Sequence, residues 1–270
     1  MTAAIRVLTC ALLVLNNSIN CLLFADDPAQ SSDQSGSEAT PATAGEDSPR
    51  VFELTDEIRD VLSPLFLSIK NADVSRTTIE YLSDSLITGQ IIDSKKATYQ
   101  IASRSPDKFT IYLKEQSQRT RIYNDGDSVI VALAPDAYFR LPDAISNSDA
   151  VLRLPIAMGP YPEPVLALSL AGVDPATSLV SGMKSIEIID EKKFRGKIPA
   201  IHLHGVQADE VSWDLWVSKS DPPKPLRMLV DLTPMLLASK ELKLPKGYSH
   251  QIRFDFLSWR VNGKVDDGLF

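Results

Sequence analysis

Cysteine is nearly absent from this chain of 270 residues, in which Cys10 and Cys21 are the only two. Both lie within the first 25 residues, which have the features of a cleaved export signal. Residues 26–270 therefore cannot form disulfide bonds, zinc–thiolate centres, thiol nucleophiles or Cys-x-x-Cys redox motifs. With 44% hydrophobic and 23% charged residues, the chain can bury one substantial core or two small ones.

The apolar run near the N-terminus is too short to span a membrane. It extends from Val7 to Leu15 after a single positive charge, and asparagines interrupt it well before the roughly 20 apolar residues that a spanning helix needs. Together with the small residue Ala25, this predicts a signal peptide over residues 1–25 and a periplasmic location. Lipidation of Cys21 is the alternative, although the preceding Ser-Ile-Asn differs from the usual Leu-Ala-Gly type of context.

An excess of positive charge is also missing. The chain has 28 basic and 35 acidic residues, a net charge of −7, and no basic stripe of the kind that phosphate backbones require, so nucleic acid is excluded as the expected partner. Residues 26–50 hold six acids, one base and no apolar residue larger than alanine or proline. Such a segment cannot offset its ordering entropy by burial, which predicts a disordered tether before a single domain over residues 51–270.

Motifs of the common enzyme classes are scarce. The sequence contains no GxSxG, HExxH, P-loop or GxGxxG pattern. Ser105 and Lys108, and again Ser181 and Lys184, fit the SxxK spacing of penicillin-recognising enzymes, but the partner motifs of those enzymes are missing. We therefore expect no catalytic residue and no cofactor.

Hydrophobic periodicity predicts an α+β fold. Thr55 and the apolar stripe that follows it indicate one amphipathic helix, which Pro64 should kink or shorten. From Val74 onward the period is two, with a tight turn at Asp125-Gly126, two short helices between Pro160 and Gly182, and strands again to the C-terminus. The expected architecture is a curved antiparallel sheet, an incomplete β-barrel, wrapped around a few short helices.

Three histidines raise the question of a metal site. On a strand, His202 and His204 point to one face, but His250 falls on the apolar face of its own strand, so the three cannot meet without a bulge. A solvated or hydrogen-bonded pair of strand histidines on the outer face is the favoured interpretation, and Asp214 or Asp231 is the alternative source of a third ligand.

The same alternation constrains the loop after these histidines. Leu203 should share a face with Leu215, whereas a two-residue loop at Ala208-Asp209 would place His204 opposite Trp213. The sequence therefore predicts a loop of odd length or a bulge between the two strands.

The strands supply many apolar side chains that point inward. They either meet in a filled core or line a half-barrel cavity for an acyl chain, because both arrangements need the same inward residues. The candidate cavity residues are Ile111, Leu113, Val129, Val131, Leu133, Trp213, Leu215, Val217, Val230, Ile252, Phe254 and Phe256. The helical lid over them would present Val165, Leu166, Leu168 and Leu170, with a hinge expected between Met158 and Pro164.

Two stretches resemble the lipoprotein-carrier superfamily of periplasmic lipoprotein localisation factors. RSPDKFTIYLKEQ and RIYNDGDSVIVALAPDAYFRL combine a strand led by proline, an Asp-Gly hairpin and a strand that ends in a proline-bearing turn. The later stretch from Val173 to Val230 is similar to one branch of that superfamily, a domain-of-unknown-function family of predicted periplasmic proteins. The matching positions are Gly196, His202, Leu203, Trp213, Trp216, Pro223 and Pro225.

The resemblance implies a LolA-like half-barrel in which sheet and helical lid enclose an apolar cavity for a lipid or lipoprotein acyl group. It extends from about Asp56 to Trp259, and it departs from the pattern at Leu133, where a tyrosine is usual. The implied partners are a lipid or an acylated protein, a separate envelope protein, and a membrane in transient contact. The alternative is a cell-envelope interaction module with the same fold, a filled core and Trp216 on its contact face.

Overall fold

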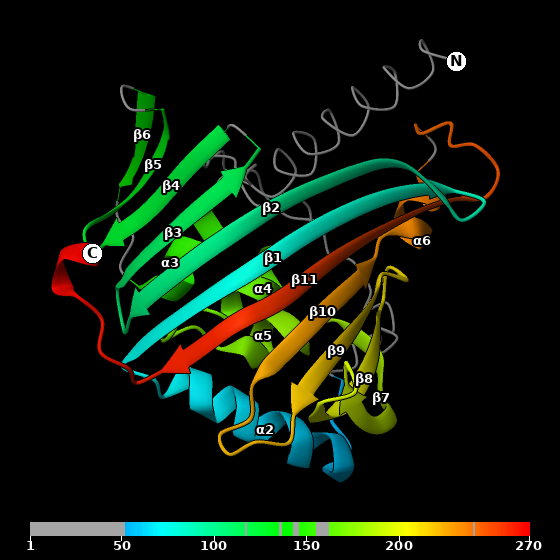
Figure 1. The fold of residues 1–270 in the computed structure, drawn as a ribbon, viewed down its shortest axis with the longest axis horizontal. Helices are drawn as coiled ribbons and strands as arrows, with labels where there is room; N and C mark the ends of the chain where they lie inside the picture. Colours follow the sequence, from blue (N-terminus) through cyan, green and yellow to red (C-terminus); the bar gives the residue numbers. More distant parts are fainter. Residues whose placement is uncertain (1–51, 117, 135–136, 143–145, 155–161, 240) are drawn as a thin grey trace, which may run out of the picture. The chain divides into compact units, whose positions relative to one another are not determined.

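The computed structural model describes residues 52–116, 118–134, 137–142, 146–154, 162–239 and 241–270. The expected signal peptide, the acidic tether and most of the expected hinge at Met158–Pro164 lie outside these residues. Within them one helix is followed by strands, then by short helices and then by strands again, which is the order that the sequence predicts apart from α6 before the last strand (Figure 1). The helices are α2 (Asp56–Lys70), α3 (Asn147–Arg153), α4 (Pro162–Ala167), α5 (Pro175–Leu179), α6 (Thr233–Ala238) and the short 3-10 helix η1 (Asp267–Leu269).

One 11-stranded antiparallel sheet contains every strand that the structure describes. Its order is β6-β5-β4-β3-β2-β1-β11-β10-β9-β8-β7, so the first and last strands of the domain pair at its centre. The strands are β1 (Val74–Ile87), β2 (Gln90–Arg104), β3 (Lys108–Glu115), β4 (Gln118–Asp125), β5 (Ser128–Ala134), β6 (Ala137–Pro142), β7 (Met183–Phe194), β8 (Ile198–Gln207), β9 (Ser212–Ser218), β10 (Pro225–Asp231) and β11 (Tyr248–Val261).

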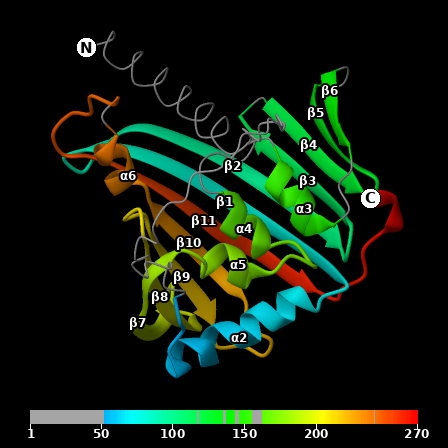
Figure 2. The same ribbon diagram turned by 180° about the vertical axis from the view of Figure 1, so that it is seen from behind.

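The strand order explains where the helices lie. β6 and β7 are the two edges of the sheet, yet they are consecutive strands in the chain. The connection between them must therefore travel from one edge to the other, and α3, α4 and α5 lie along it, across the inner face of the curved sheet (Figure 2). The expected curved antiparallel sheet over short helices is confirmed.

Helix α2 begins where the sequence predicts but does not end early. The Thr55 side chain caps the helix by accepting a hydrogen bond from the backbone N–H of Ile58. The expectation that Pro64 would shorten the helix is wrong, because the helix continues to Lys70. Because Pro64 has no backbone N–H, the carbonyl of Asp60 has no helical hydrogen-bond partner. Both residues are exposed, so water can donate a hydrogen bond to that carbonyl.

The loop between β8 and β9 confirms the expected odd length. Three residues, 208–210, separate Gln207 from Val211, and the backbone N–H of Gln207 donates to the carbonyl of Val211. Leu203 consequently lies opposite Leu215, on the buried face of both strands. Glu210 adopts a φ of 66°, the left-handed conformation that three-residue hairpin loops commonly use.

A β-bulge keeps β11 in phase with the core. Ile79 pairs with Phe256 and Thr78 with Ser258, which leaves Leu257 without a partner and 56% exposed. Such a bulge bends a strand and increases its twist, which suits a strand at the centre of a curved sheet.

Helices α3 and α6 were not anticipated. Ser146 caps α3 by accepting from the backbone N–H of Asp149, a Ser-x-x-Asp pattern that is visible in the sequence. Helix α6 starts with Pro at its second residue, Pro234, a common position for proline in the first turn. Helix α3 has 7 residues and α6 has 6, so both are too short for a helical period to stand out in the sequence.

We predict that Gly205→Ala destabilises the domain. A Cβ at Gly205 would lie 2.5 Å from the ring of Trp213 and 2.7 Å from the methyl group of Met183, both buried. Overpacking of this kind lowers the free energy of unfolding by about 1–3 kcal/mol, measurable by urea denaturation. Gly263→Ala is the control, because nothing lies within 4 Å of its Cβ, and equal effects of both changes would contradict the prediction.

Candidate functional site

The apolar inner face of the sheet is the larger of two candidate sites. Eleven of the twelve expected cavity residues lie on this face and are at most 8% exposed. Trp213, Leu215 and Phe254 are completely buried, and Trp213 Nε1 has no hydrogen-bond partner among the described residues. In this structure the inner face is therefore covered by other atoms.

Leu133 is the twelfth residue, and its expected inward position is wrong. It is 45% exposed near the end of β5, whereas Val129 and Val131 of the same strand are buried. The pairing of β5 with β6 shifts between Ala132 and Ala134, and this irregularity removes Leu133 from the alternation.

Part of the cover over the inner face is an apolar strip, residues 164–171, formed by the end of α4 and the residues that follow it. Every residue of the strip is buried. It contains all four expected lid residues, Val165, Leu166, Leu168 and Leu170, each no more than 1% exposed. Asp174 caps the next helix, α5, by accepting from the backbone N–H of Ala176, as the sequence predicts.

Polar side chains of the sheet hold the backbone of this strip. Ser75 Oγ donates to the carbonyl of Ser169 (2.8 Å), and the backbone N–H of Ala171 donates to Ser103 Oγ (2.7 Å). Asn147 Nδ2 of α3 donates to the carbonyl of Ala171 (2.9 Å). The two serine hydroxyls are 2.8 Å apart, so they form one buried polar anchor between the strip and the strands β1 and β2.

This anchor was not predicted from the sequence. Ser75 and Ser103 occupy inward positions of their strands, in phase with apolar residues such as Ile79 and Ile101. Buried polar side chains need hydrogen-bond partners. Two serines at inward strand positions therefore could have indicated a polar contact on the inner face.

A second polar group lies on the inner face near α6. His250 is buried there, with Nδ1 3.0 Å from Ser85 Oγ and Nε2 3.3 Å from Ser83 Oγ. Burial lowers the pKa of His250, because the charged imidazolium loses its hydration, and this outweighs the opposing effect of Asp93. The expected inward position of His250 is confirmed.

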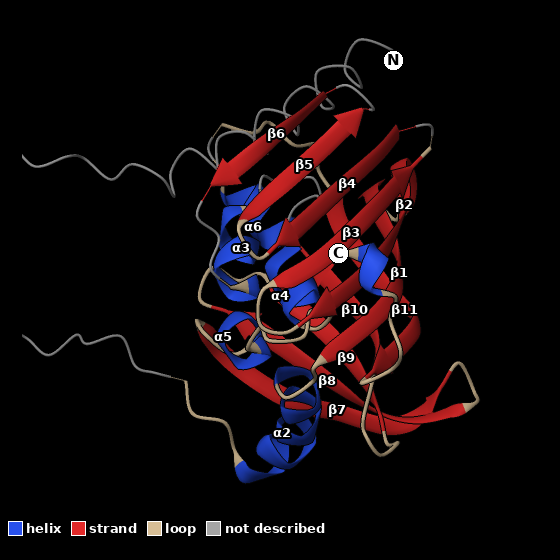
Figure 3. Ribbon diagram, turned by 90° about the vertical axis from the view of Figure 1, so that its left-hand side faces the viewer, coloured by secondary structure: helices blue, strands red, loops and turns tan. Residues whose placement is uncertain are grey.

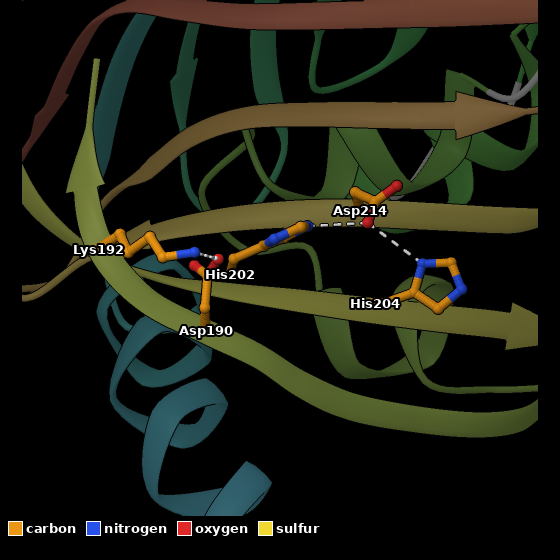
Figure 4. A network of polar contacts seen from close by, with 5 residues as sticks. All are labelled: Asp190, Lys192, His202, His204 and Asp214. Atoms are coloured by element: carbon orange, nitrogen blue, oxygen red, sulfur yellow. Dashed lines mark hydrogen bonds and ion pairs between the residues drawn. The ribbon is translucent and has the colours of Figure 1, made fainter. Parts of the chain in front are cut away.

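The other candidate site is on the outer face, where His202 and His204 share one carboxylate. His202 Nε2 is 2.8 Å and His204 Nδ1 3.1 Å from the same oxygen of Asp214 (Figure 4). The favoured interpretation, a hydrogen-bonded pair on the outer face, is thus confirmed. Across the described residues, no cluster of three or more His, Cys, Asp or Glu side chains has the arrangement of a metal site.

Aromatic and arginine side chains continue this network across the outer face. The ring of His202 stacks on Trp216 with centroids 4.2 Å apart, and the guanidinium of Arg227 lies over the same Trp216 ring. Arg227 Nε also donates to Asp255 (2.7 Å), a nearly buried carboxylate. Arg195 Nη2 lies 3.1 Å from the same Asp255 oxygen, and Arg253 Nε lies 3.2 Å from the other one. These ion pairs and ring contacts are made within the domain, which is typical of a structural polar layer.

The chain matches one family of known proteins in sequence. Residues 60–270 match the model of a family described as predicted periplasmic protein (DUF2092). No curated protein matches the chain in sequence. In the described part of the chain, no helix combines the length and the apolar character needed to cross a membrane.

Two solved structures are similar over most of their length. One is a domain from Vibrio parahaemolyticus described as that of an outer membrane lipoprotein-sorting protein, with 10% identity and a TM-score of 0.32, covering 77% of this chain and 94% of that chain. The other is a LolA superfamily protein from Nitrosomonas europaea, with 9% identity and a TM-score of 0.33, covering 78% of this chain and 96% of that chain.

We predict that His250 makes the fold sensitive to mild acid. Because its folded-state pKa is lowered, the unfolded chain binds the proton more readily, so stability present above the ordinary pKa of about 6.5 is lost as the pH falls below it. The thermal unfolding midpoint should fall less between pH 8 and about pH 5 in His250→Gln than in the parent protein. His204→Gln on the outer face is the control, and an unchanged pH profile in His250→Gln would refute the assignment.

Proposed function

The chain belongs to this family of predicted periplasmic proteins, and from that premise we propose that it is an exported carrier that shields an apolar chain from water. Its ligand would be a lipid or the acyl group of a lipoprotein. The chain would lie against the inner face of the sheet, in the place that the apolar strip 164–171 occupies. In this proposal the protein has no catalytic role and no cofactor.

The apolar strip is the observation that supports the proposal. Strip 164–171 is completely buried next to β1 and β2, yet it consists of the end of a short helix and a few residues that follow it. Its backbone is held by side-chain hydrogen bonds from Ser75, Ser103 and Asn147. A segment attached in this way can leave as a unit without breaking the pairing of any two strands.

The free energy lost when the strip leaves the inner face and the free energy gained when an acyl chain binds there are similar. Burial of the four lid side chains is worth about 1.5–3 kcal/mol each, or roughly 6–12 kcal/mol in total. An acyl chain of about a dozen carbons gains about 0.8 kcal/mol per methylene, or roughly 10 kcal/mol. A bound chain can therefore replace the strip at little net cost, which a reversible carrier requires.

An interaction module of the cell envelope is the second candidate. The complete burial of Trp213, Leu215 and Phe254 favours it, because a permanently filled core needs no ligand. In that case the strip 164–171 would be an ordinary part of the core and would stay in place.

Lipid content separates the two candidates. The protein is purified from the periplasm, native mass spectrometry is used to look for bound lipid, and a fluorescent fatty acid is then titrated in solution. The carrier should retain lipid and bind the probe at one site. A protein that carries no lipid and takes up no probe is not a carrier, and the contact module then stands.

We predict that Ser75→Ala/Ser103→Ala raises the affinity for the probe. The double change removes the anchor of the strip and leaves two buried backbone groups without partners, so it destabilises the closed arrangement by about 1–2 kcal/mol. Probe binding should tighten by roughly tenfold, because less free energy is needed to displace the strip.

Ser94→Ala/Thr98→Ala is the matched control for this measurement. Both residues are on β2, on the outer face, away from the strip. Probe affinity should be unchanged in this variant. If the two double variants behave alike, the strip does not control access to the inner face.

A further inference from the structure

The outer face of the sheet has a basic end, and we propose that this end docks on an anionic lipid bilayer. It is formed by the end of β3, the start of β4, the end of β5 and the start of β6. The proposal goes beyond carriage, because it concerns the opposite face of the sheet and holds whether or not the inner face takes up lipid.

Charge is distributed unevenly over strands β3 to β6. Strand register places several cations on the outer face of these strands, and the outward carboxylate among the described residues is Asp125, at the far end of β4. This concentration of positive charge occurs in a chain whose net charge is −7. The outward cations toward the basic end are Lys114, Arg119 and Arg121, whereas Lys108 lies opposite Asp125 and Arg140 acts on the same carboxylate.

Two of these cations face each other without a counter-charge. Lys114 lies directly opposite Arg119 in the β3–β4 pair, and both are exposed. Like charges at directly opposed positions destabilise a sheet. The neighbouring Glu115 points to the inner face, since it pairs with the buried Ala97, and neither Lys114 nor Arg119 forms an ion pair with a residue that the structure describes. An external anion would relieve this repulsion.

Exposed apolar side chains lie at the same end. Strands β3 and β5 point in the same direction, so the last residues of both strands lie at one end of the sheet (Figure 3). Leu133 and Tyr138, 45% and 71% exposed, are at the end of β5 and the start of β6. The outward row Arg121, Ala132 and Tyr138 connects them to the cations.

This combination fits a bilayer surface. Each Lys or Arg near an anionic membrane gains about 1 kcal/mol, while tyrosine and leucine side chains enter the headgroup region. The last residues of β3 and β5 lie at one end of the sheet, so their side chains can approach one plane together. Because the rest of the chain is acidic, an anionic surface would repel other orientations and select this one.

Vesicle sedimentation tests the proposal. The purified protein is mixed with vesicles of phosphatidylethanolamine and phosphatidylglycerol, or of phosphatidylcholine alone, at low and high salt. We expect binding to the anionic vesicles that weakens with salt, and little binding to phosphatidylcholine. Lys114→Gln/Arg119→Gln should weaken binding by about thirtyfold, while its unfolding midpoint stays the same or rises because the repulsion is gone.

Lys193→Gln/Lys197→Gln is the matched control, because it removes two exposed cations from the β7–β8 hairpin and changes the net charge equally. It should bind vesicles like the parent protein. Leu133→Ser/Tyr138→Ser should weaken binding to anionic vesicles and leave its salt dependence in place.

Three outcomes would overturn the proposal. The first is that the parent protein does not sediment with anionic vesicles at low salt. The second is that Lys114→Gln/Arg119→Gln and Lys193→Gln/Lys197→Gln lose binding equally. The third is that the basic end binds an acidic polypeptide and not vesicles. The last result would identify an acidic protein as the partner. Carriage is measured with a soluble probe and no vesicles, so its failure and the failure of docking are separate results.

Discussion

The pairing of β1 with β11 is the contact on which the rest of the domain depends. It joins Ser75 to Val261 at one end and Ile87 to Tyr248 at the other, so the first and last strands of the domain meet at the centre of the sheet. Each of the two meanders, β1–β6 and β7–β11, would expose an apolar face by itself. Their union creates one broad curved surface, and the loop-closure entropy of joining such distant segments is offset by the core that this surface buries.

This topology also decides what covers the inner face. Because the two edges β6 and β7 are consecutive in the chain, their connection crosses the inner face, and the buried apolar strip 164–171 is part of it. The backbone hydrogen bonds of the strip are mostly internal, and side chains of Ser75, Ser103 and Asn147 attach it to the rest of the domain. Apolar burial and attachment by a few side chains thus occur in one segment. That is the physical basis for proposing an exchange with an acyl chain.

The polar side chains on the two faces of the sheet differ in burial and in their partners. On the inner face, His250 and the serines are buried and paired, so they act on stability and attachment. On the outer face, Arg195, Arg227 and Arg253 each lie against the carboxylate of Asp255, whereas Lys114 and Arg119 have no ion-pair partner among the described residues. The unpaired cations of β3 and β4 are therefore where a charged surface would act.

The sequence by itself determined the local features, because these depend on neighbouring residues. Alternation predicted which side chains between Ile111 and Phe256 point inward, with Leu133 as the exception. Residue type predicted the helix caps at Thr55 and Asp174. The position of Leu203 opposite Leu215 predicted a loop of odd length before β9. Only the tertiary structure decided whether the inner face is covered, how Ser75 and Ser103 meet the strip, and that Lys114 opposes Arg119. Those facts depend on register and long-range closure between segments far apart in the chain. An alternating pattern states which way a side chain points, but not what it meets there.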